Sequence, residues 1–415
     1  MSEKELKGKI KNKTVLVGIV GVGYVGEALA YAITNKGFHT VGFEIDQSRI
    51  TFLKNKQIPR FTITSNKNLL KDCQVILISI PTPLLPDKSP DLSYLKQAVL
   101  EVSQRLSPGK LVVIESSVAP GTTADILQPI LESSHLKAEK DFYLAYSPER
   151  VDPGNRSFNV NSIPKVVSGI GPLSLSLASA FYRQIVEKVV PVSNTTTAEM
   201  TKVLENVFRL VNISLVNELV EYAKALKINM WEVIDAAATK PFGFLAHYPG
   251  PGAGGYCIPV LPMYLLESAR KKNIRLPLVE TAEALNDHQP EKVAGMALNI
   301  LNGKKEDKNH PPKALLIGIS YKADLADTRE SVALKIWRRL EDEGVEVYYH
   351  DPYVSKLNGS TSVNLDPGII KDMNLIIITT PHKNIPYETL VSSDKPLFDT
   401  QNVLSNFHNG NIIRL

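Results

Sequence analysis

Hydrophobic positions in the first third of the chain fall into short, almost continuous runs, separated by stretches with helical spacing. Uninterrupted runs of Val, Ile and Leu are typical of strands buried on both faces of a parallel sheet. The alternation therefore predicts an α/β region of strands and covering helices. Strands are expected at residues 14–20, 40–44, 74–80, 111–115 and 142–146, and a helix at 26–36.

The pattern changes near residue 195, where apolar residues begin to recur at helical spacing and continue to residue 226 without a proline. This spacing predicts one long helix, with Ser193 and Asn194 as candidate caps. Further helix is expected to about residue 287, interrupted by the Gly/Pro-rich segment 248–262. A long helix between two α/β regions is suited to joining domains and to dimerisation.

A charged segment without periodicity, residues 303–312, ends in two prolines and is interpreted as a linker. After it the α/β pattern restarts, with strands expected at 314–319, 345–350 and 375–380 and a helix at 331–343. The first turn of this region, from Gly318 to Tyr321, lacks a second glycine. It is therefore a poorer dinucleotide site and a better candidate for another ligand.

Composition narrows the class of protein. A chain of 415 residues is too long for one core, so two or three domains are expected. A formal net charge of +4 argues against a nucleic-acid partner, and no apolar run reaches the roughly 20 residues that cross a membrane. The Lys-rich opening, residues 1–13, is interpreted as a solvated tail. The two cysteines, Cys73 and Cys257, exclude a disulfide framework and favour a cytoplasmic protein, and no metal site is expected.

One motif indicates a cofactor. The hexapeptide GVGYVG at residues 21–26 matches G-x-G-x-x-G between an expected strand and helix, where glycines let a pyrophosphate approach the helix N-terminus. Glu44 ends the next strand, about 20 residues on, where a carboxylate can accept hydrogen bonds from ribose and disfavours a 2′-phosphate. The motif therefore favours NAD over NADP, and the alternative is a structural turn without a ligand. The predicted cofactor residues are Gly21, Gly23, Tyr24, Val25, Gly26, Glu44 and Arg49.

The segment GPGAGGYCIP, residues 250–259, places Cys257 directly behind four glycines. Such a loop lets the backbone approach a ligand, and a cysteine behind it is a candidate nucleophile toward a carbonyl carbon. The alternative is a small buried hydrophobic residue, which is also our interpretation of Cys73.

Three further polar residues are candidates for chemistry. Lys202 and Asn206 are four positions apart on the long helix and share a face, so they can polarise a developing oxyanion or simply face solvent. Glu149 follows an expected strand end, where α/β sheets place ligands. It is a candidate general base, and the alternative is a surface ion pair with Arg150.

A series of segments in a fixed order resembles the UDP-sugar 6-dehydrogenases over essentially the whole chain. The segments are GVGYVG, SIPTPL, ESSVAPGTT, YSPERVDPGN, TKVLENVFRLVNISLVNEL, KPFGF, YPGPGAGGYCIP, GISYKADLADTRES and YHDPYV. SPERVDPGN and the KPFGF to YPGPG segment look most like the branch acting on UDP-N-acetylglucosamine. The resemblance implies a homodimer or higher homo-oligomer, and it implies that the product, a nucleotide-linked uronic acid, is used for surface polysaccharide. It also implies oxidation of a C6 alcohol to a carboxylate with two NAD⁺ and one water, without release of an aldehyde.

The resemblance also implies roles for individual residues. Cys257 would capture the aldehyde as a thiohemiacetal that is oxidised to a thioester, and Glu149 would activate the hydrolytic water. Lys202 and Asn206 would stabilise the C6 oxygen. Thr82 corresponds to a cofactor contact, and Ser117, grouped with it, to a hydroxyl residue near that water. The expected substrate residues are Lys322, Arg329 of the D-x-R-E-S element, and Tyr248, Gly252, Gly254 and Gly255 around the sugar diphosphate.

Three positions depart from that family. Leu261 replaces an aspartate that assists proton transfer, Gln401 replaces an arginine that contacts the substrate, and Tyr256 replaces a histidine. Loss of a positioned acid or base typically costs about 10²–10⁴-fold in rate, and glutamine cannot replace a bidentate guanidinium. One alternative is therefore a catalytically impaired or substrate-altered member that binds NAD and a nucleotide sugar. Another is a 3-hydroxyacid dehydrogenase, which would have no use for the cysteine loop.

The predicted fold class is α/β, with two Rossmann-like doubly wound domains joined by a long central helix and a helical middle domain. We expect an NAD-binding domain at residues 1–190 and a central dimerisation domain with the cysteine loop at 191–301. A UDP-sugar-binding domain is expected at 302–415.

Overall fold

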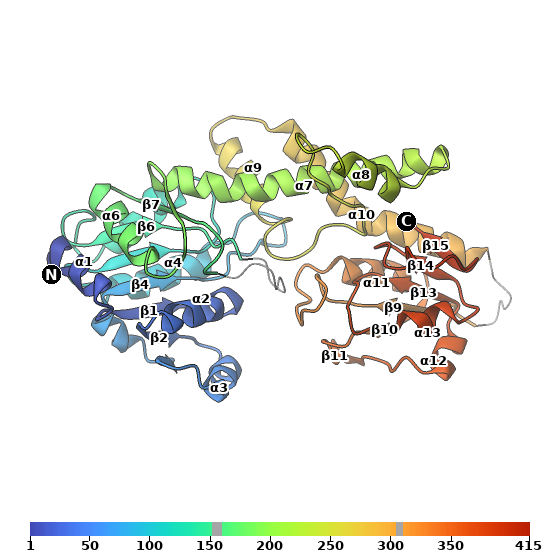
Figure 1. Cartoon of the computed structure of the whole chain (residues 1–415), viewed down its shortest axis with the longest axis horizontal. Helices are drawn as coiled ribbons and strands as arrows, with labels where there is room; N and C mark the ends of the chain where they lie inside the picture. The colour runs from blue at the N-terminus through green and yellow to red at the C-terminus, as the bar shows by residue number, and fades with distance from the viewer. Residues whose placement is uncertain (152–159, 304–309) are drawn as a thin grey trace. The chain divides into compact units, whose positions relative to one another are not determined.

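The computed structural model describes residues 1–151, 160–303 and 310–415 (Figure 1). Part of the predicted SPERVDPGN motif and the centre of the predicted linker lie outside the described residues. The chain forms two compact units. The first unit is Met1–Glu205 with Met263–Ile274, and the second is Asn206–Pro262 with Arg275–Leu415. The three-domain division at residues 190 and 301 stays a prediction.

The first unit is built on an eight-stranded sheet in the order β3-β2-β1-β4-β5-β6-β7-β8, in which only β6 and β7 pair antiparallel. Its inner strands β4, β5 and β6 are buried along their whole length, which is why the sequence shows continuous apolar runs. The strands are β1 Leu16–Val20, β2 His39–Phe43, β3 Phe61–Thr64, β4 Val75–Ile78, β5 Leu111–Ile114, β6 Tyr143–Tyr146, β7 Lys165–Gly169 and β8 Val189–Pro191.

Helices cover both faces of this sheet, because alternate strand side chains enter two separate hydrophobic clusters. One cluster packs against α1, α2, α3 and α6, and the other against α4, η2 and α5. The helices are α1 Glu3–Lys11, α2 Tyr24–Asn35, α3 Gln47–Asn55, α4 Ser93–Ser103, α5 Gln128–Glu132 and α6 Pro172–Tyr182, with a 3₁₀ turn η1 Lys67–Asp72 and a π-helical turn η2 Thr123–Leu127.

The expectation of a solvated tail at residues 1–13 is wrong. These residues form α1, whose Leu6 and Ile10 are fully buried in the first-unit core. Their i, i+4 spacing creates an apolar stripe that the surrounding lysines mask in the composition. Ser2 caps the helix by accepting the Glu5 N–H.

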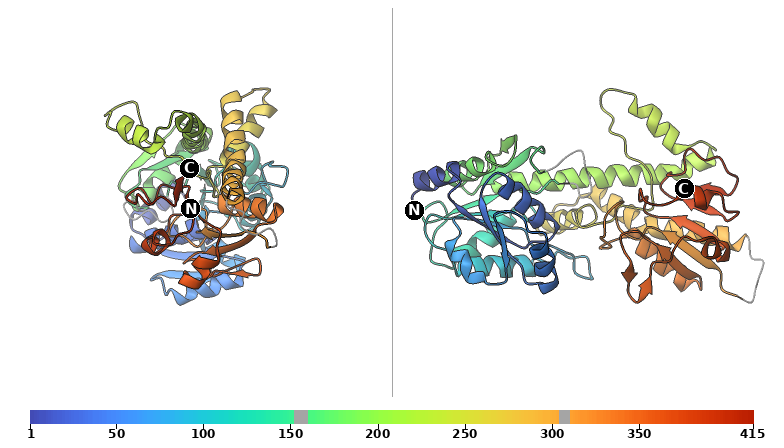
Figure 2. Two further views of the ribbon diagram at one scale, coloured as in Figure 1. Left: turned by 90° about the vertical axis from the view of Figure 1, so that its right-hand side faces the viewer. Right: turned by 60° about the horizontal axis from the view of Figure 1, so that its bottom comes forward.

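The long helix is confirmed as α7 Thr195–Ala225, which runs without a break in the right-hand view of Figure 2. Asn194 accepts the Thr197 N–H and is its cap, whereas Ser193 bonds only the Thr197 hydroxyl. The helices that follow are α8 Met230–Ala238, α9 Leu261–Lys271 and α10 Pro277–Asn302. The last one continues through Pro290, so the helical region extends beyond the expected end near residue 287.

The second unit contains a five-stranded parallel sheet in the order β10-β9-β13-β14-β15, with hydrophobic clusters on both faces. Its strands are β9 Lys313–Ile317, β10 Glu346–His350, β13 Leu375–Ile378, β14 Leu397–Asp399 and β15 Ile412–Arg414. Its helices are α11 Val332–Asp342, α12 Pro367–Asp372 and α13 Tyr387–Val391, and β11 Lys356–Leu357 pairs with β12 Ser360–Thr361 in a hairpin. The predicted fold class is confirmed. No helix in the described ranges is long and apolar enough to span a membrane.

Candidate active site

The glycine loop between β1 and α2 is shaped for a ligand. A Cβ on Gly26 would lie 2.1 Å from the Gly21 carbonyl oxygen, so glycine is required there by packing of the chain on itself. By contrast, a Cβ on Gly23 would have no neighbour within 4 Å. No side chain caps the N-terminus of α2 at Gly23. The loop therefore offers open space and helix-terminal N–H groups, which fit a pyrophosphate.

Glu44 and Arg49 are both fastened to this loop. Glu44 follows β2, and its carboxylate accepts N–H bonds from Val22 at 3.0 Å and from Ile45 at 2.8 Å. Arg49 donates to the carbonyl oxygens of Val22 and Gly23, and its guanidinium pairs with a neighbouring carboxylate. Because protein groups already engage this guanidinium, it is not set up to receive a 2′-phosphate. The geometry thus agrees with NAD.

Thr82 and Ser117 lie beyond the carboxyl ends of the neighbouring strands β4 and β5. The Thr82 hydroxyl donates to the Ser117 carbonyl oxygen at 2.7 Å, and the Ile80 N–H donates to the Ser116 hydroxyl at 2.9 Å. The structure therefore brings these two predicted residues together at the edge of the sheet where parallel α/β folds bind ligands.

Glu149 follows β6 and belongs to a buried charge cluster. One carboxylate oxygen lies 2.7 Å from Lys165 Nζ, and the other accepts the N–H groups of Arg150 and Val151. Lys165 Nζ also lies 2.6 Å from a carboxylate oxygen of Glu115. The alternative of a surface pair between Glu149 and Arg150 is wrong, because the Arg150 guanidinium instead pairs with a glutamate of α7.

The pKa values of the two carboxylates in this cluster are shifted in opposite directions. Burial raises the pKa of Glu115. Burial acts in the same direction on Glu149, but the Lys165 ammonium and its hydrogen bond hold the pKa of Glu149 below its ordinary value. Lys165 and Glu115 were not among the predicted site residues, because they pair across 50 residues at the ends of different strands. The signal that could have identified Lys165 is its place at the start of a wholly buried strand, because a buried lysine is almost always paired.

Lys202 and Asn206 lie one turn apart on α7 with exposed fractions of 9% and 3%. The alternative of a solvent-facing pair is therefore wrong. Glu199, one turn before Lys202, accepts N–H groups from Gly121 at 2.6 Å and Thr123 at 2.8 Å. It ties the loop that follows β5 to the helix, and burial raises its pKa to about 7.

In the second unit, Cys257 lies on the loop before α9 with an exposed thiol, whereas Cys73 is buried as expected. The buried-hydrophobe alternative for Cys257 is therefore wrong. Helix side chains hold the preceding glycine segment: Asn217 accepts the Gly250 N–H, and the Asn286 amide bonds both backbone groups of Ala253. These buried amides were not among the predicted site residues.

The glycines of this loop serve close packing. A Cβ on Gly254 would lie 2.5 Å from the Glu330 carbonyl oxygen, and one on Gly255 would lie 2.6 Å from the Tyr321 ring. Gly252 has a φ of +118°, which side chains rarely adopt. The cysteine loop thus packs directly on the segment that carries Lys322 and Arg329.

The Arg329 guanidinium lies 4.5 Å from the centre of the Tyr256 ring and forms an ion pair with Asp327. Tyr248 donates its hydroxyl to Asp235 at 2.7 Å. The residue beside the proposed nucleophile is therefore joined to the predicted substrate-binding segment.

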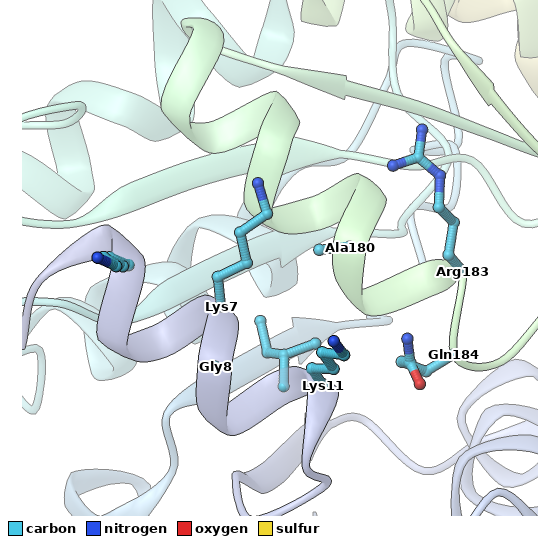
Figure 3. Close-up of a pocket in the computed structure, with 8 residues that line it drawn as sticks. Lys7, Gly8, Lys11, Ala180, Arg183 and Gln184 are labelled. Carbon is cyan, nitrogen blue, oxygen red and sulfur yellow. The ribbon is translucent and has the colours of Figure 1, made fainter.

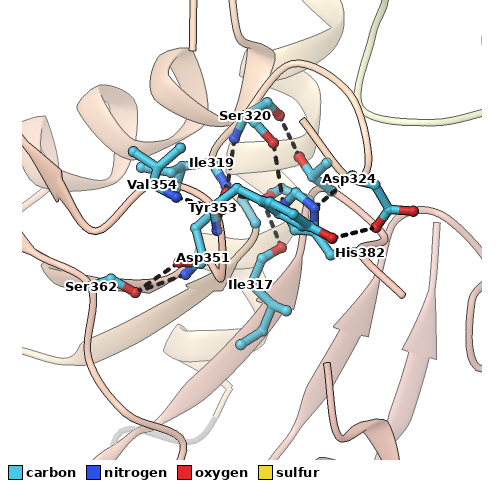
Figure 4. Close-up of polar contacts among 12 residues, drawn as sticks. Ile317, Ile319, Ser320, Asp324, Asp351, Tyr353, Val354, Ser362 and His382 are labelled. Carbon is cyan, nitrogen blue, oxygen red and sulfur yellow. Dashed lines mark hydrogen bonds and ion pairs between the residues drawn. The ribbon is translucent and has the colours of Figure 1, made fainter. Parts of the chain in front are cut away.

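A buried network fixes the start of that segment (Figure 4). Asp351 accepts the Ile319 N–H at 2.8 Å and lies 3.0 Å from His382 Nε2. His382 Nδ1 accepts the Asp324 N–H at 2.9 Å, so the ring proton lies on Nε2 and is directed at the carboxylate. Burial raises the pKa of Asp351, but the hydrogen bonds from His382 and the backbone outweigh it and hold this pKa below its ordinary value.

The structure also shows the surroundings of two departures from the family. Leu261 is 1% exposed, begins α9, and donates its N–H to the Cys257 carbonyl oxygen. The Gln401 side-chain amide donates to the Thr379 carbonyl oxygen at 3.0 Å. Both replacements are thus accommodated by the fold.

A hollow of about 360 Å³ lies between α1 and α6. The cationic side chains of Lys7, Lys11 and Arg183 are among those that line it (Figure 3). It contains none of the residues predicted for cofactor or substrate. In the described parts of the chain, no three His, Cys, Asp or Glu side chains are grouped to hold a metal.

Comparison with known proteins agrees with this arrangement. Three domains defined for the UDP-glucose/GDP-mannose dehydrogenase family match the chain: the NAD binding domain at residues 60–186, the central domain at 196–288 and the UDP binding domain at 315–406. UDP-N-acetyl-D-mannosamine dehydrogenase of Pyrococcus horikoshii is 32% identical, over 94% of this chain and 96% of that protein. UDP-N-acetyl-D-glucosamine 6-dehydrogenase of Pseudomonas aeruginosa is 33% identical, over 86% of this chain and 87% of that protein.

A solved structure is similar throughout its length. The UDP-D-ManNAc dehydrogenase structure from Pyrococcus horikoshii has a TM-score of 0.86 at 30% identity, covering 96% of this chain and 98% of that one. The fold and the glycine loop together define the class of protein, which is an NAD-binding oxidoreductase of α/β type. The chain belongs to the UDP-glucose/GDP-mannose dehydrogenase family and is an NAD-dependent UDP-sugar dehydrogenase.

Proposed function

We propose that the chain oxidises the C6 alcohol of a UDP-N-acetylhexosamine to the carboxylate, with Cys257 as the covalent nucleophile. The observation that carries this proposal is the exposed Cys257 thiol at the end of a glycine loop fixed by Asn217 and Asn286. A thiol with no role in the core, behind a loop held this firmly, is suited to attack a bound carbonyl carbon.

The glycine loop and Glu44 would hold NAD⁺, which would accept the hydride in each of the two oxidations. Lys202 and Asn206 would polarise the C6 oxygen as charge develops on it. Cys257 would add its sulfur to the aldehyde carbon, and loss of a second hydride from that carbon leaves a thioester. Glu149 would then take a proton from the attacking water.

Leu261 and Gln401 predict a slower enzyme rather than a different reaction. Leu261 provides no acid beside the cysteine loop, and the Gln401 amide has no charge for a phosphate or carboxylate. The retained set Cys257, Glu149 and Lys202 supports catalysis over simple binding of NAD and a nucleotide sugar, since a binder does not need these groups.

The N-acetylglucosamine epimer is the substrate that the sequence motifs favour. The relatives named for the mannosamine epimer make it the second candidate. The product would be a UDP-linked uronic acid for surface polysaccharide. The discriminating experiment compares kcat/KM for both UDP-N-acetyl epimers and for UDP-glucose, with the product identified by mass spectrometry. A preference for UDP-glucose would contradict the N-acetylhexosamine assignment.

The exposed side of α7 supports a homodimer. Large apolar side chains recur along one stripe of this helix with exposed fractions of 39–65%. They are Leu204, Phe208, Leu215, Leu219 and Tyr222. A second copy of the chain would remove this surface from water.

A further inference from the structure

Lys165, the first residue of β7, is enclosed between two carboxylates in the first unit. Its side chain is 4% exposed, and Nζ lies 2.6 Å from Glu115 and 2.7 Å from Glu149. Glu115 is itself held by the Tyr182 hydroxyl, which donates to its second oxygen. Burial of three charged groups is costly, and the family-based roles leave Lys165 and Glu115 without a task.

We infer that Lys165, anchored by Glu115, is a positioning residue that keeps Glu149 ionised and oriented for hydrolysis of the thioester. This inference rests on the proposed function and concerns its last step.

The hydrogen-bond geometry of Glu149 supports this role. A carboxylate has about four acceptor sites, two on each oxygen. The N–H groups of Arg150 and Val151 engage one oxygen, and Lys165 engages the other. Among the described residues, these three fixed donors leave about one site, on the oxygen beside Lys165, to accept a proton from water.

The step balances without another reactant. The water oxygen adds to the thioester carbon while Glu149 takes one water proton. The carbon–sulfur bond then breaks with its electron pair going to sulfur. The second water proton passes to that sulfur, which gives the Cys257 thiol and the sugar carboxylate, and Glu149 returns its proton to solvent.

Electrostatics explain why the cation is needed. Glu149 faces Lys165 from β7 and, beyond it, Glu115 from the end of β5. Among the described residues, a further charged pair nearby is Arg150 with Glu205 of α7. Without the ammonium, two buried carboxylates would repel each other, and Glu149 would take up a proton and lose its function as a base.

The test is rapid mixing of Lys165→Met enzyme with NAD⁺ and the substrate. We expect a burst of two NADH per active site at a normal rate, followed by a steady rate reduced about 10²-fold or more. Hydroxylamine, which cleaves thioesters without a base, should restore turnover. Lys165→Arg should keep most of the activity, and the pH–rate profile of Lys165→Met should move its acid limb to higher pH.

Glu115→Gln with Lys165→Met removes one charge of each sign and serves if the single variant fails to fold, with the same burst expected. A burst and steady rate that fall together, or an unchanged steady rate, would overturn the role of Lys165. Absence of any NADH from the wild type, or full turnover by Cys257→Ser, would instead overturn the proposed function.

Discussion

Gly23 and Gly26 belong to one motif, but glycine is needed at the two positions for different reasons. Gly26 is fixed by packing, since a Cβ there would meet the Gly21 carbonyl oxygen. Gly23 faces open space in front of α2, where the fold alone would tolerate a side chain. A sequence motif cannot separate these two roles, whereas the backbone geometry does.

Substitution by alanine should separate them experimentally. Gly26→Ala is expected to lower the free energy of unfolding by more than about 2 kcal/mol, because backbone must move. Gly23→Ala should keep the melting temperature of the wild type but weaken NAD binding at least about tenfold, by filling the pyrophosphate space. Calorimetric titration with NAD and thermal melts measure both, and wild-type NAD affinity in Gly23→Ala would contradict the proposed cofactor position.

Glu199 predicts a pH dependence of stability. Burial raises its folded-state pKa from 4.5 to about 7, so the folded chain binds more protons than the unfolded chain between these values. Its contribution is therefore fully present below about pH 4.5 and is lost as the pH rises through about 7. Relative to Glu199→Gln, the wild type should lose up to roughly 1.4 kcal/mol per pH unit in this window. Urea denaturation at several pH values measures this, and parallel profiles would refute it.

Helix α1 shows how an element can escape detection. Its composition is dominated by lysine, yet Leu6 and Ile10 are fully buried in the first-unit core. Strands β14 and β15 were missed for a related reason, because three residues each are too few to establish a pattern. The β1–α2–β2 region and α7 could be predicted because their periodicity persists over many residues.

Leu6→Ala and Ile10→Ala should each cost about 2–5 kcal/mol in the free energy of unfolding, because each empties a fully buried site. The control is Lys9→Ala on the exposed side of the same helix, expected within about 0.5 kcal/mol of the wild type. If Leu6→Ala behaves like Lys9→Ala in denaturant titrations, α1 is not part of the core.

At the scale of the whole molecule, the exposed apolar stripe on α7 predicts that two copies of the chain form a dimer. Leu204→Glu with Leu215→Glu places two charges on exposed positions, which a monomer would accept without loss. In a dimer built on this stripe, the same charges would lie in an apolar interface. We therefore expect multi-angle light scattering to show a dimer for the wild type and a monomer for the variant, with unchanged circular dichroism. A monomeric wild type would contradict the dimer.

The chemistry could be predicted from sequence only in part. Local segments identified the cofactor loop and Cys257, because each role is carried by neighbouring residues. The cluster of Lys165 with Glu115 and Glu149 could not be predicted, since it depends on the order of β5, β6 and β7 in the sheet. The buried amides of Asn217 and Asn286 likewise become visible only when the helices are packed.

The central claim is a four-electron oxidation through Cys257, and counting NADH tests it most directly. Purified protein with excess NAD⁺ and a limiting amount of UDP-N-acetylglucosamine or its manno epimer should form two NADH per sugar consumed. The product should be a carboxylate, and Cys257→Ser should lose turnover. One NADH per sugar with an aldehyde product, or two NADH per sugar from Cys257→Ser, would contradict the account.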